Sequence, residues 1–346
     1  MNGFIKLFLS TALISSFSLA ARIGLDARTD FESFSANQAA AKPAYSVFKI
    51  SRLKLDFQGS LGADNSFRTR IDPLKVDKAT AKNVRDGVSS YVDFAFITHN
   101  LNEDWSVAMG KIITGMGGVE AMNNPADLYL RSTAGDEVAS IYWPTGAQVV
   151  GKFGDHKLTI NAANISDDVT SSSNLSSTSH LFGLTYTSKL ADGMIMPNLS
   201  YHSESFNDSS LNKTTKYYLA AGAKLVVNTF DIEFDYLNNN RKYDTQSTQL
   251  LDTQSLVALV RYSLEMGSVH TKYETSALKT AISATDSAKS TINGITLAYE
   301  FKPVKDDNWR AHIAATQKDT KADGVDTKTE KKIFVGMRLL ADFLKQ

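Results

Sequence analysis

The chain has 346 residues, and its 37 lysine and arginine residues are balanced by 37 aspartate and glutamate residues. A formal net charge of zero provides no bulk electrostatic attraction to nucleic acid. The absence of cysteine excludes disulfides, thiol chemistry and zinc sites built on cysteine.

Residues 1–20 predict a secretory signal peptide. Lys6 precedes an apolar stretch at residues 7–17, and positions 18 and 20 carry small residues that suit a signal peptidase. The apolar stretch is too short to cross a bilayer as a helix. We therefore expect export, cleavage after Ala20 and a mature domain at residues 21–346. That domain has no apolar run near the roughly twenty residues of a membrane helix.

Apolar and polar residues instead alternate with a period of two, which is typical of β-strands. In residues 91–98 (YVDFAFIT), Val92, Phe94 and Phe96 share one face. In residues 230–236 (FDIEFDY), every second residue is a carboxylate and the residues between are large and apolar. Three carboxylates in a row would be too costly in a dry protein core.

A water-filled membrane barrel accommodates both faces, because apolar side chains contact lipid and charged side chains line an aqueous lumen. Because apolar and polar residues alternate, they cancel in any average along the sequence, and the mean hydropathy resembles that of a soluble protein. The charged side chains that we expect in the lumen are Arg52, Lys54, Lys224, Asp231, Glu233, Asp235, Arg261, Arg310 and Arg338.

The number and length of these segments predict the architecture. Roughly fifteen candidates run for about ten residues each, the length that a tilted strand needs to cross the hydrocarbon layer. Because bacterial barrels close with an even number of strands, we predict an all-β, transmembrane antiparallel barrel of about 16 strands, within a range of 14–18. Short turns such as 154–155 and 228–229 alternate with long polar loops, as periplasmic turns alternate with outer loops.

One region resembles a known family. Residues 91–120 form a strand, a turn and a second strand that ends in Gly110-Lys111, followed by a glycine-rich turn to Glu120. This outline resembles the phosphate-selective porin O and P family. The resemblance implies a sixteen-stranded channel, often trimeric, with loops that fold inward and narrow the pore. The anion-binding members use lumen arginines and clustered lysines, whereas the lumen residues inferred here mix both signs.

The segment 115–146 is long for a connection between two strands, and long ordered loops are often functional. We expect a short helix at residues 119–124 that ends before Pro125. We also expect the loop to fold into the lumen as a constriction, although an outward loop with solvated charges is the alternative. Its charged side chains, with Lys111 at the end of the preceding strand, are Lys111, Glu120, Asp127, Arg131, Asp136 and Glu137.

These patterns favour an outer-membrane porin for passive diffusion of small hydrophilic solutes and ions, with weak charge selectivity. The alternatives are an anion- or phosphate-selective channel, an adhesin or receptor acting through its outer loops, and a barrel enzyme. The six histidines are scattered and lie in no recognisable site motif, so we expect no enzyme activity, cofactor or metal. Expected partners are outer-membrane lipid and lipopolysaccharide, the barrel-assembly machinery, and two further copies of the chain in a homotrimer. Phe343 is the expected signal for the assembly machinery.

Overall fold

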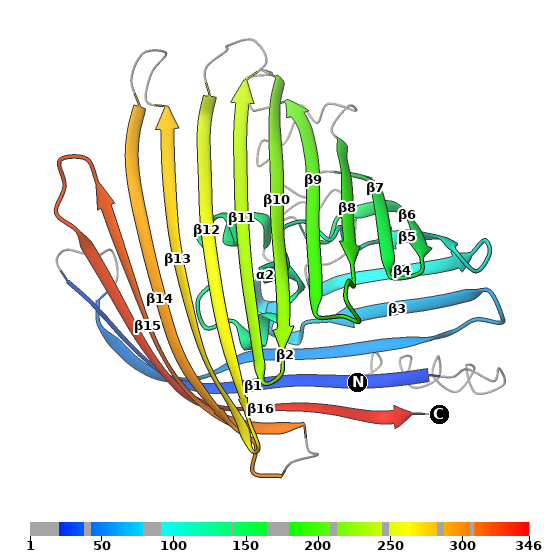
Figure 1. The fold of residues 1–346 in the computed structure, drawn as a ribbon, viewed down its shortest axis with the longest axis horizontal. Coiled ribbons are helices and arrows are strands. Elements are labelled where there is room, and N and C mark those ends of the chain that lie inside the picture. The colour runs from blue at the N-terminus through cyan, green and yellow to red at the C-terminus, as the bar shows by residue number, and fades with distance from the viewer. Residues whose placement is uncertain are drawn as a thin grey trace.

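The computed structural model describes residues 21–37, 43–78, 91–139, 142–164, 180–207, 213–243, 249–281, 287–304 and 308–345. The expected signal peptide at residues 1–20 lies outside this range. The described residues form a closed barrel in which each strand is hydrogen-bonded to its neighbours in sequence, which confirms the predicted sixteen-stranded antiparallel fold (Figure 1). Its strands are β1 (Ala21–Ala36), β2 (Tyr45–Ser60), β3 (Asn65–Ile71), β4 (Val92–Asn100), β5 (Trp105–Lys111), β6 (Thr145–Phe153), β7 (His156–Asn164), β8 (His180–Ser188), β9 (Ile195–Asn207), β10 (Lys213–Val227), β11 (Phe230–Tyr243), β12 (Gln249–Leu264), β13 (Gly267–Ala281), β14 (Ser287–Phe301), β15 (Trp309–Ala322) and β16 (Lys328–Lys345).

Closure joins the two ends of the described chain. β1 pairs with β16 over most of its length, with Phe31 opposite Val335 and Arg28 opposite Arg338 (Figure 1). Closure leaves the described strands without an open sheet edge, and it satisfies the backbone donors and acceptors that lipid could not.

The two faces of β11 and β14 follow the predicted alternation, whereas on β4 the apolar face with Phe94 is turned inward, where Phe94 is 1% exposed. On β11, Phe234 is 52% exposed on the outside of the barrel, whereas the neighbouring Glu233 is 3% exposed on the inside. β14 alternates in the same way over its second half, with Ile295, Leu297 and Tyr299 exposed. The apolar outer surface is the surface that faces lipid.

The short connections are tight turns. Asn228, in the two-residue turn between β10 and β11, has a φ of 53°, a left-handed conformation that asparagine tolerates better than most residues. Gly154 has a φ of 58° in the turn between β6 and β7. Of the long polar loops predicted from the sequence, residues 165–179 lie outside the described residues, whereas the polar segments 238–254 and 275–291 are mostly strand.

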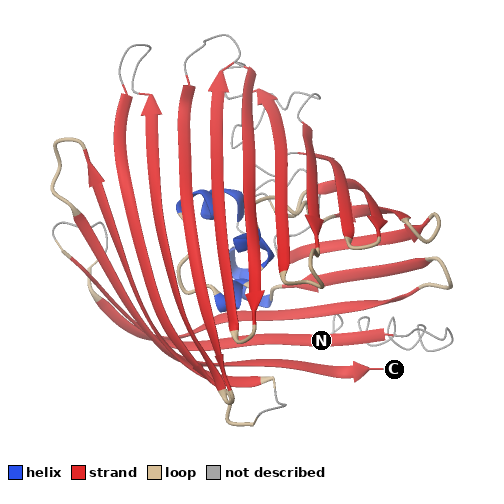
Figure 2. Cartoon of the chain, in the orientation of Figure 1, coloured by secondary structure: helices blue, strands red, loops and turns tan. Residues whose placement is uncertain are grey.

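The helices are short, and three of them follow one another in the connection between β5 and β6. These are α2 (Val119–Met122), the 3-10 helix η3 (Pro125–Asp127) and α3 (Thr133–Ala139), whereas the 3-10 helix η2 (Pro73–Lys78) connects β3 to β4. Figure 2 shows the helices as a group behind the strands of the barrel wall. α2 lies within the predicted helix 119–124, but α3 was not predicted. No described helix is long and apolar enough to cross a bilayer.

Candidate channel constriction

The β5–β6 connection, residues 112–144, is held to the inward-facing side chains of the barrel wall. Its first part binds short polar residues of β7 and β8 through backbone carbonyls. The Asn161 side-chain amide donates to the carbonyl of Thr114 at 2.8 Å, and the Thr185 hydroxyl donates to the carbonyl of Gly115 at 3.2 Å. These bonds direct the chain across the lumen side of the wall.

Asp235 anchors the start of α2. Its two carboxylate oxygens accept hydrogen bonds from the backbone N–H groups of Val119 and Glu120, each at 2.7 Å. These donors have no partner within the helix, and their partial positive charge favours a carboxylate. A side chain at Gly118 would collide with this carboxylate, because its Cβ would lie 2.0 Å from Oδ1 of Asp235. The glycine-rich turn seen in the sequence therefore permits this close approach.

Glu120 braces the loop from within. Its carboxylate accepts hydrogen bonds from the Ser132 backbone at 2.9 Å and from the Ser132 hydroxyl, and it forms an ion pair with Lys272 of β13. Glu120 and Lys272 are both 4% exposed. The structure thus places Glu120 in a nearly buried contact between the loop and the wall at the edge of the pore, because the helix turns its side chain toward Lys272.

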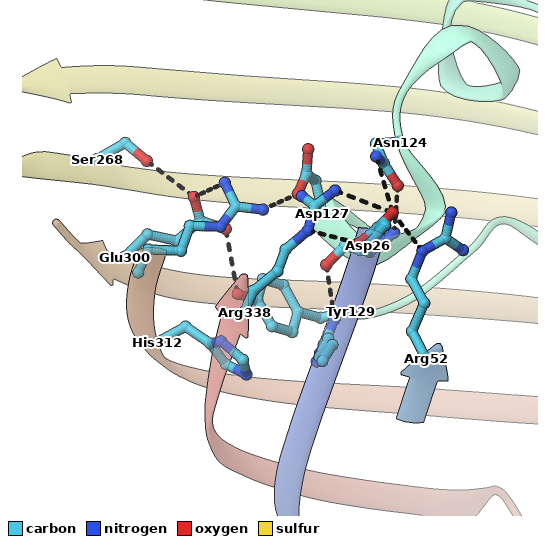
Figure 3. A network of polar contacts seen from close by, with 12 residues as sticks. Asp26, Arg52, Asn124, Asp127, Tyr129, Ser268, Glu300, His312 and Arg338 are labelled. Atoms are coloured by element: carbon cyan, nitrogen blue, oxygen red, sulfur yellow. Dashed lines mark hydrogen bonds and ion pairs between the residues drawn. The ribbon is translucent and has the colours of Figure 1, made fainter. Parts of the chain in front are cut away.

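Asp127 and Tyr129 anchor the middle of the loop to β14, β15 and β16 (Figure 3). Asp127 forms ion pairs with Arg310 of β15 and Arg338 of β16. The Tyr129 hydroxyl donates to Glu300 of β14 at 3.2 Å, and burial raises the pKa of Tyr129. These contacts pair three charged residues that the sequence analysis assigned to the lumen or the constriction, namely Asp127, Arg310 and Arg338.

α3 holds the last part of the loop against β11 and β12. Glu137 accepts hydrogen bonds from the Asn239 amide at 2.9 Å and the Thr253 hydroxyl at 2.7 Å. Burial raises the pKa of Glu137. The side chain of Asp136 is 61% exposed and lies 4.0 Å from Arg131, so these two charges face open space.

The open space lies between this loop and the wall formed by β2, β3 and β4. A cavity of about 470 Å³ is lined there by Arg52, Arg68 and Arg70 of the wall and by Arg131 of the loop. A second cavity of about 240 Å³ shares the three wall arginines. Arg68 and Arg70 were missed in the sequence analysis, although their spacing of two in NSFRTRI places them on one face of a strand.

Arg68 and Arg70 of the wall are each paired with an acid that is less exposed than the arginine. Arg68 donates to Asp56 at 2.6 Å, and their side chains are 40% and 24% exposed. Arg70 donates to Asp93 at 2.9 Å, and Asp93 has no exposed side-chain surface. These two arginine side chains are therefore more exposed to the open space than the carboxylates that neutralise them.

The other predicted residues lie in wall networks. Lys224 binds Asp231 at 2.7 Å and approaches Glu233 to 3.7 Å, and Arg261 lies 3.9 Å from Asp231. Glu233 also accepts a bond from the Asn123 amide at 2.6 Å. The acidic row of β11 is thus used by wall cations and by the loop.

The remaining basic residues lie near the loop ends and the β2 wall. Lys54 is 8% exposed in its side chain and binds Asp72 at 2.5 Å and Asp93 at 2.7 Å. Arg52 donates to Asp26 at 2.6 Å, and Lys111 is the last residue of β5, opposite Thr145. In the described part of the chain, no group of three or more histidine, aspartate and glutamate residues could hold a metal ion.

The family model for the phosphate-selective porins O and P matches residues 22–218, more than half of the chain. The chain belongs to this family. It is therefore an outer-membrane channel of the porin type, and the predicted resemblance is confirmed. No curated protein matches the porin by sequence.

Solved structures share the fold of this porin. OmpT of Vibrio cholerae is 10% identical, with a TM-score of 0.65 over 94% of this chain and 98% of that chain. An anion-selective porin from Comamonas acidovorans is 12% identical, with a TM-score of 0.65 over 94% of this chain and 100% of that chain. The outer-membrane channel DcaP of Acinetobacter baumannii is 11% identical, with a TM-score of 0.59 over 93% of this chain and 97% of that chain.

Proposed function

We propose that this porin lets small hydrophilic solutes and ions diffuse passively across the outer membrane, with a weak preference for anions. Four arginines line the larger cavity between the β5–β6 loop and the wall, and this observation carries the proposal. Among the described residues that line this cavity, the one carboxylate is Glu120, which is paired with Lys272. Positive charge therefore dominates the lining of this cavity. If the loop narrows the passage here, screening by salt is least effective at the same place.

The preference is weak because the arginines are not free charges. Asp56 and Asp93 lie within hydrogen-bond distance of Arg68 and Arg70. In a wet pore, such fields fade over about 8–10 Å at physiological salt. We therefore expect an excess of chloride over potassium flux without exclusion of cations. The anion-selective porin from Comamonas acidovorans, which shares the fold, supports this direction.

Reversal potential in a planar bilayer under a KCl gradient tests the proposal. The reversal potential of wild-type channels should have the sign expected for a channel that prefers chloride. Arg68→Gln should shift this potential toward the value for a channel that prefers potassium. A substitution of Ser172, in a predicted outer loop, is the control and should leave the potential unchanged. A wild type that passes no current would reject the channel and favour an adhesin or receptor, and a cation-selective wild type would reject the anion preference.

We propose no enzymatic activity for this barrel. The strongest histidine–carboxylate pair joins His312 to Asp30 at 2.7 Å, and both side chains are 1% exposed. The ring of Tyr129 covers His312, with ring centroids 5.3 Å apart. A buried pair beneath a loop residue supports a bracing role more than contact with a substrate.

Exposed lysines near the ends of β13, β14 and β15 support lipopolysaccharide as a partner. Lys279 of β13 lies directly opposite Lys289 of β14, and both are exposed on the outward face. Lys321 of β15, also exposed, lies opposite Thr291, two residues from Lys289. Like charges directly opposite one another destabilise a sheet, so an anionic group between them would relieve the repulsion. We infer that these lysines contact phosphates of the outer leaflet.

We also infer export by the signal peptide at residues 1–20, assembly by the barrel-assembly machinery, and a homotrimer. Phe343 is 61% exposed near the end of β16, where an assembly factor could bind it. One structure of Vibrio cholerae OmpT with the same fold is described as a trimer form. Chemical cross-linking in detergent would test the trimer: a single band of monomer would contradict it.

A further inference from the structure

The cavity between the loop and the arginine wall has two chemically different sides. The wall contributes the guanidinium groups described above. The loop contributes apolar side chains that include Ile113, Met122, Tyr142 and Trp143. Met122 is 60% exposed although it lies on the inward loop, so its thioether is presented to the open space.

Aromatic rings hold the guanidinium groups in place on this boundary. The Arg70 guanidinium lies 4.5 Å from the ring centre of Phe94 and 5.0 Å from that of Trp143. Trp143 also lies 5.0 Å from the ammonium group of Lys75. Such cation–π contacts fix the orientation of a guanidinium without using its N–H donors. The hydrogen bond of Arg70 to Asp93 uses Nε and not a terminal nitrogen.

Arg52 has the same arrangement, because its bond to Asp26 also uses Nε. The terminal N–H groups of a guanidinium match the two oxygens of a carboxylate. A purely inorganic anion would use these donors but would leave the apolar side of the cavity in contact with water. A volume of about 470 Å³ falls in the range of small-molecule sites, which combine apolar walls with a few placed polar groups.

We propose that this cavity is a weak binding site for organic carboxylates with a compact apolar body, such as an aromatic ring. The carboxylate binds the wall arginines, and the apolar body lies against Met122 and Trp143. The inference rests on the proposed function, since it names the solute class that the same constriction favours. Transient binding at this site raises the local concentration of such solutes and thereby their flux at low external concentration.

The test compares benzoate with two matched probes, acetate and benzamide. Acetate keeps the carboxylate without the ring, and benzamide keeps the ring without the charge. Binding to purified protein in detergent is followed by tryptophan fluorescence, with Trp143→Phe to assign the signal, and by interruptions of single-channel current. We expect benzoate to bind about tenfold more tightly than either probe, the effect of one well-placed apolar or ionic contact.

Two variants separate the two halves of the site. Met122→Gln should reduce benzoate affinity about threefold to tenfold and leave acetate unchanged. Arg52→Gln should weaken benzoate and acetate by the same factor, and Arg338 still pairs with Asp26 in this variant. Met122 is exposed, so its substitution should not disturb folding, and heat-modified gel mobility verifies the barrel of each variant.

The outcomes distinguish this inference from the proposed function. If chloride is preferred but benzoate binds no more tightly than acetate, the organic-anion site is rejected and the channel function stands. If fluorescence shows selective benzoate binding in a channel without anion preference, the selectivity proposal is rejected and the site stands. Equal loss of benzoate and acetate binding in Met122→Gln would also overturn the site.

Discussion

The carboxylate of Asp235 accepts a hydrogen bond from the backbone N–H of Val119 at 2.7 Å, and this contact joins the middle of β11 to the start of α2. The two residues are separated by 116 positions in the sequence. One acid of a lumen-facing row is thus used to hold the loop that narrows the lumen.

Replacement of this acid should loosen the loop. Asp235→Asn keeps the volume but removes the charge and one of two acceptors, so docking of α2 should weaken by about 1–2 kcal/mol. Hydrogen exchange of residues 119–139 should become faster, and single-channel noise should increase. Asp231→Asn is the matched control, because Asp231 is on the same face but pairs with Lys224. Equal effects of the two substitutions would contradict the anchoring role of Asp235.

The buried ion pair between Glu120 and Lys272 predicts strong coupling. Lys272→Met leaves the Glu120 carboxylate without its cation at 4% exposure, a situation that typically costs about 3–5 kcal/mol. The double variant Glu120→Gln with Lys272→Met should recover a large part of that loss. Guanidinium unfolding in lipid vesicles provides the four free energies of the double-mutant cycle. Additive losses, with no recovery in the double variant, would show that the pair is not coupled.

The outward face of β11 predicts the site of lipid contact. Phe234→Arg should lower the free energy of unfolding by about 2–4 kcal/mol if it lies near the bilayer midplane. Phe234→Leu should be tolerated, because it keeps an apolar side chain at the same place. The neighbouring Glu233→Gln, on the inward face, should still fold. The measurement is the same unfolding titration, and an Arg variant as stable as the Leu variant would refute the assigned face.

The pKa of Glu137 predicts how loop docking depends on pH. Burial raises this pKa against the opposing hydrogen bonds from Asn239 and Thr253, so the docked loop holds the proton more tightly than a released loop. Docking is therefore strongest below the pKa of the released loop, and it weakens as pH rises through the raised pKa. Hydrogen exchange of α3, corrected for intrinsic rates, should show more protection near pH 4 than near pH 7.

Glu137→Gln cannot ionise, so its protection of α3 should change much less between the two pH values. Asp136 remains present in both proteins, so its own contribution to the pH dependence is common to the two. The informative quantity is therefore the difference between wild type and variant. An identical pH dependence in the two would assign the effect to groups other than Glu137.

The sequence alone determined the wall of this protein. A side-chain period of two is a local property of a strand, so the order of residues along β11 is enough to assign its inward acids and its outward aromatic residues. The need to close a barrel with an even number of strands then predicted sixteen. The spacing of Arg68 and Arg70 carried the same local signal, although it was not used.

Only the tertiary structure decided which charges remain at the open passage. In the sequence, nothing distinguishes Glu120, Asp127 and Asp235 from the other acidic residues. In the structure, contacts with residues more than a hundred positions away bury or neutralise them. The position of Phe94 was also decided by the tertiary structure. The pairing of β3 with β4 contains a register shift, and next to it the Phe94 side chain faces inward beside Arg70, where it is 1% exposed. Alternation shows which residues share a face, whereas the partner across the lumen determines whether a charge is exposed, because pairing depends on distance in space.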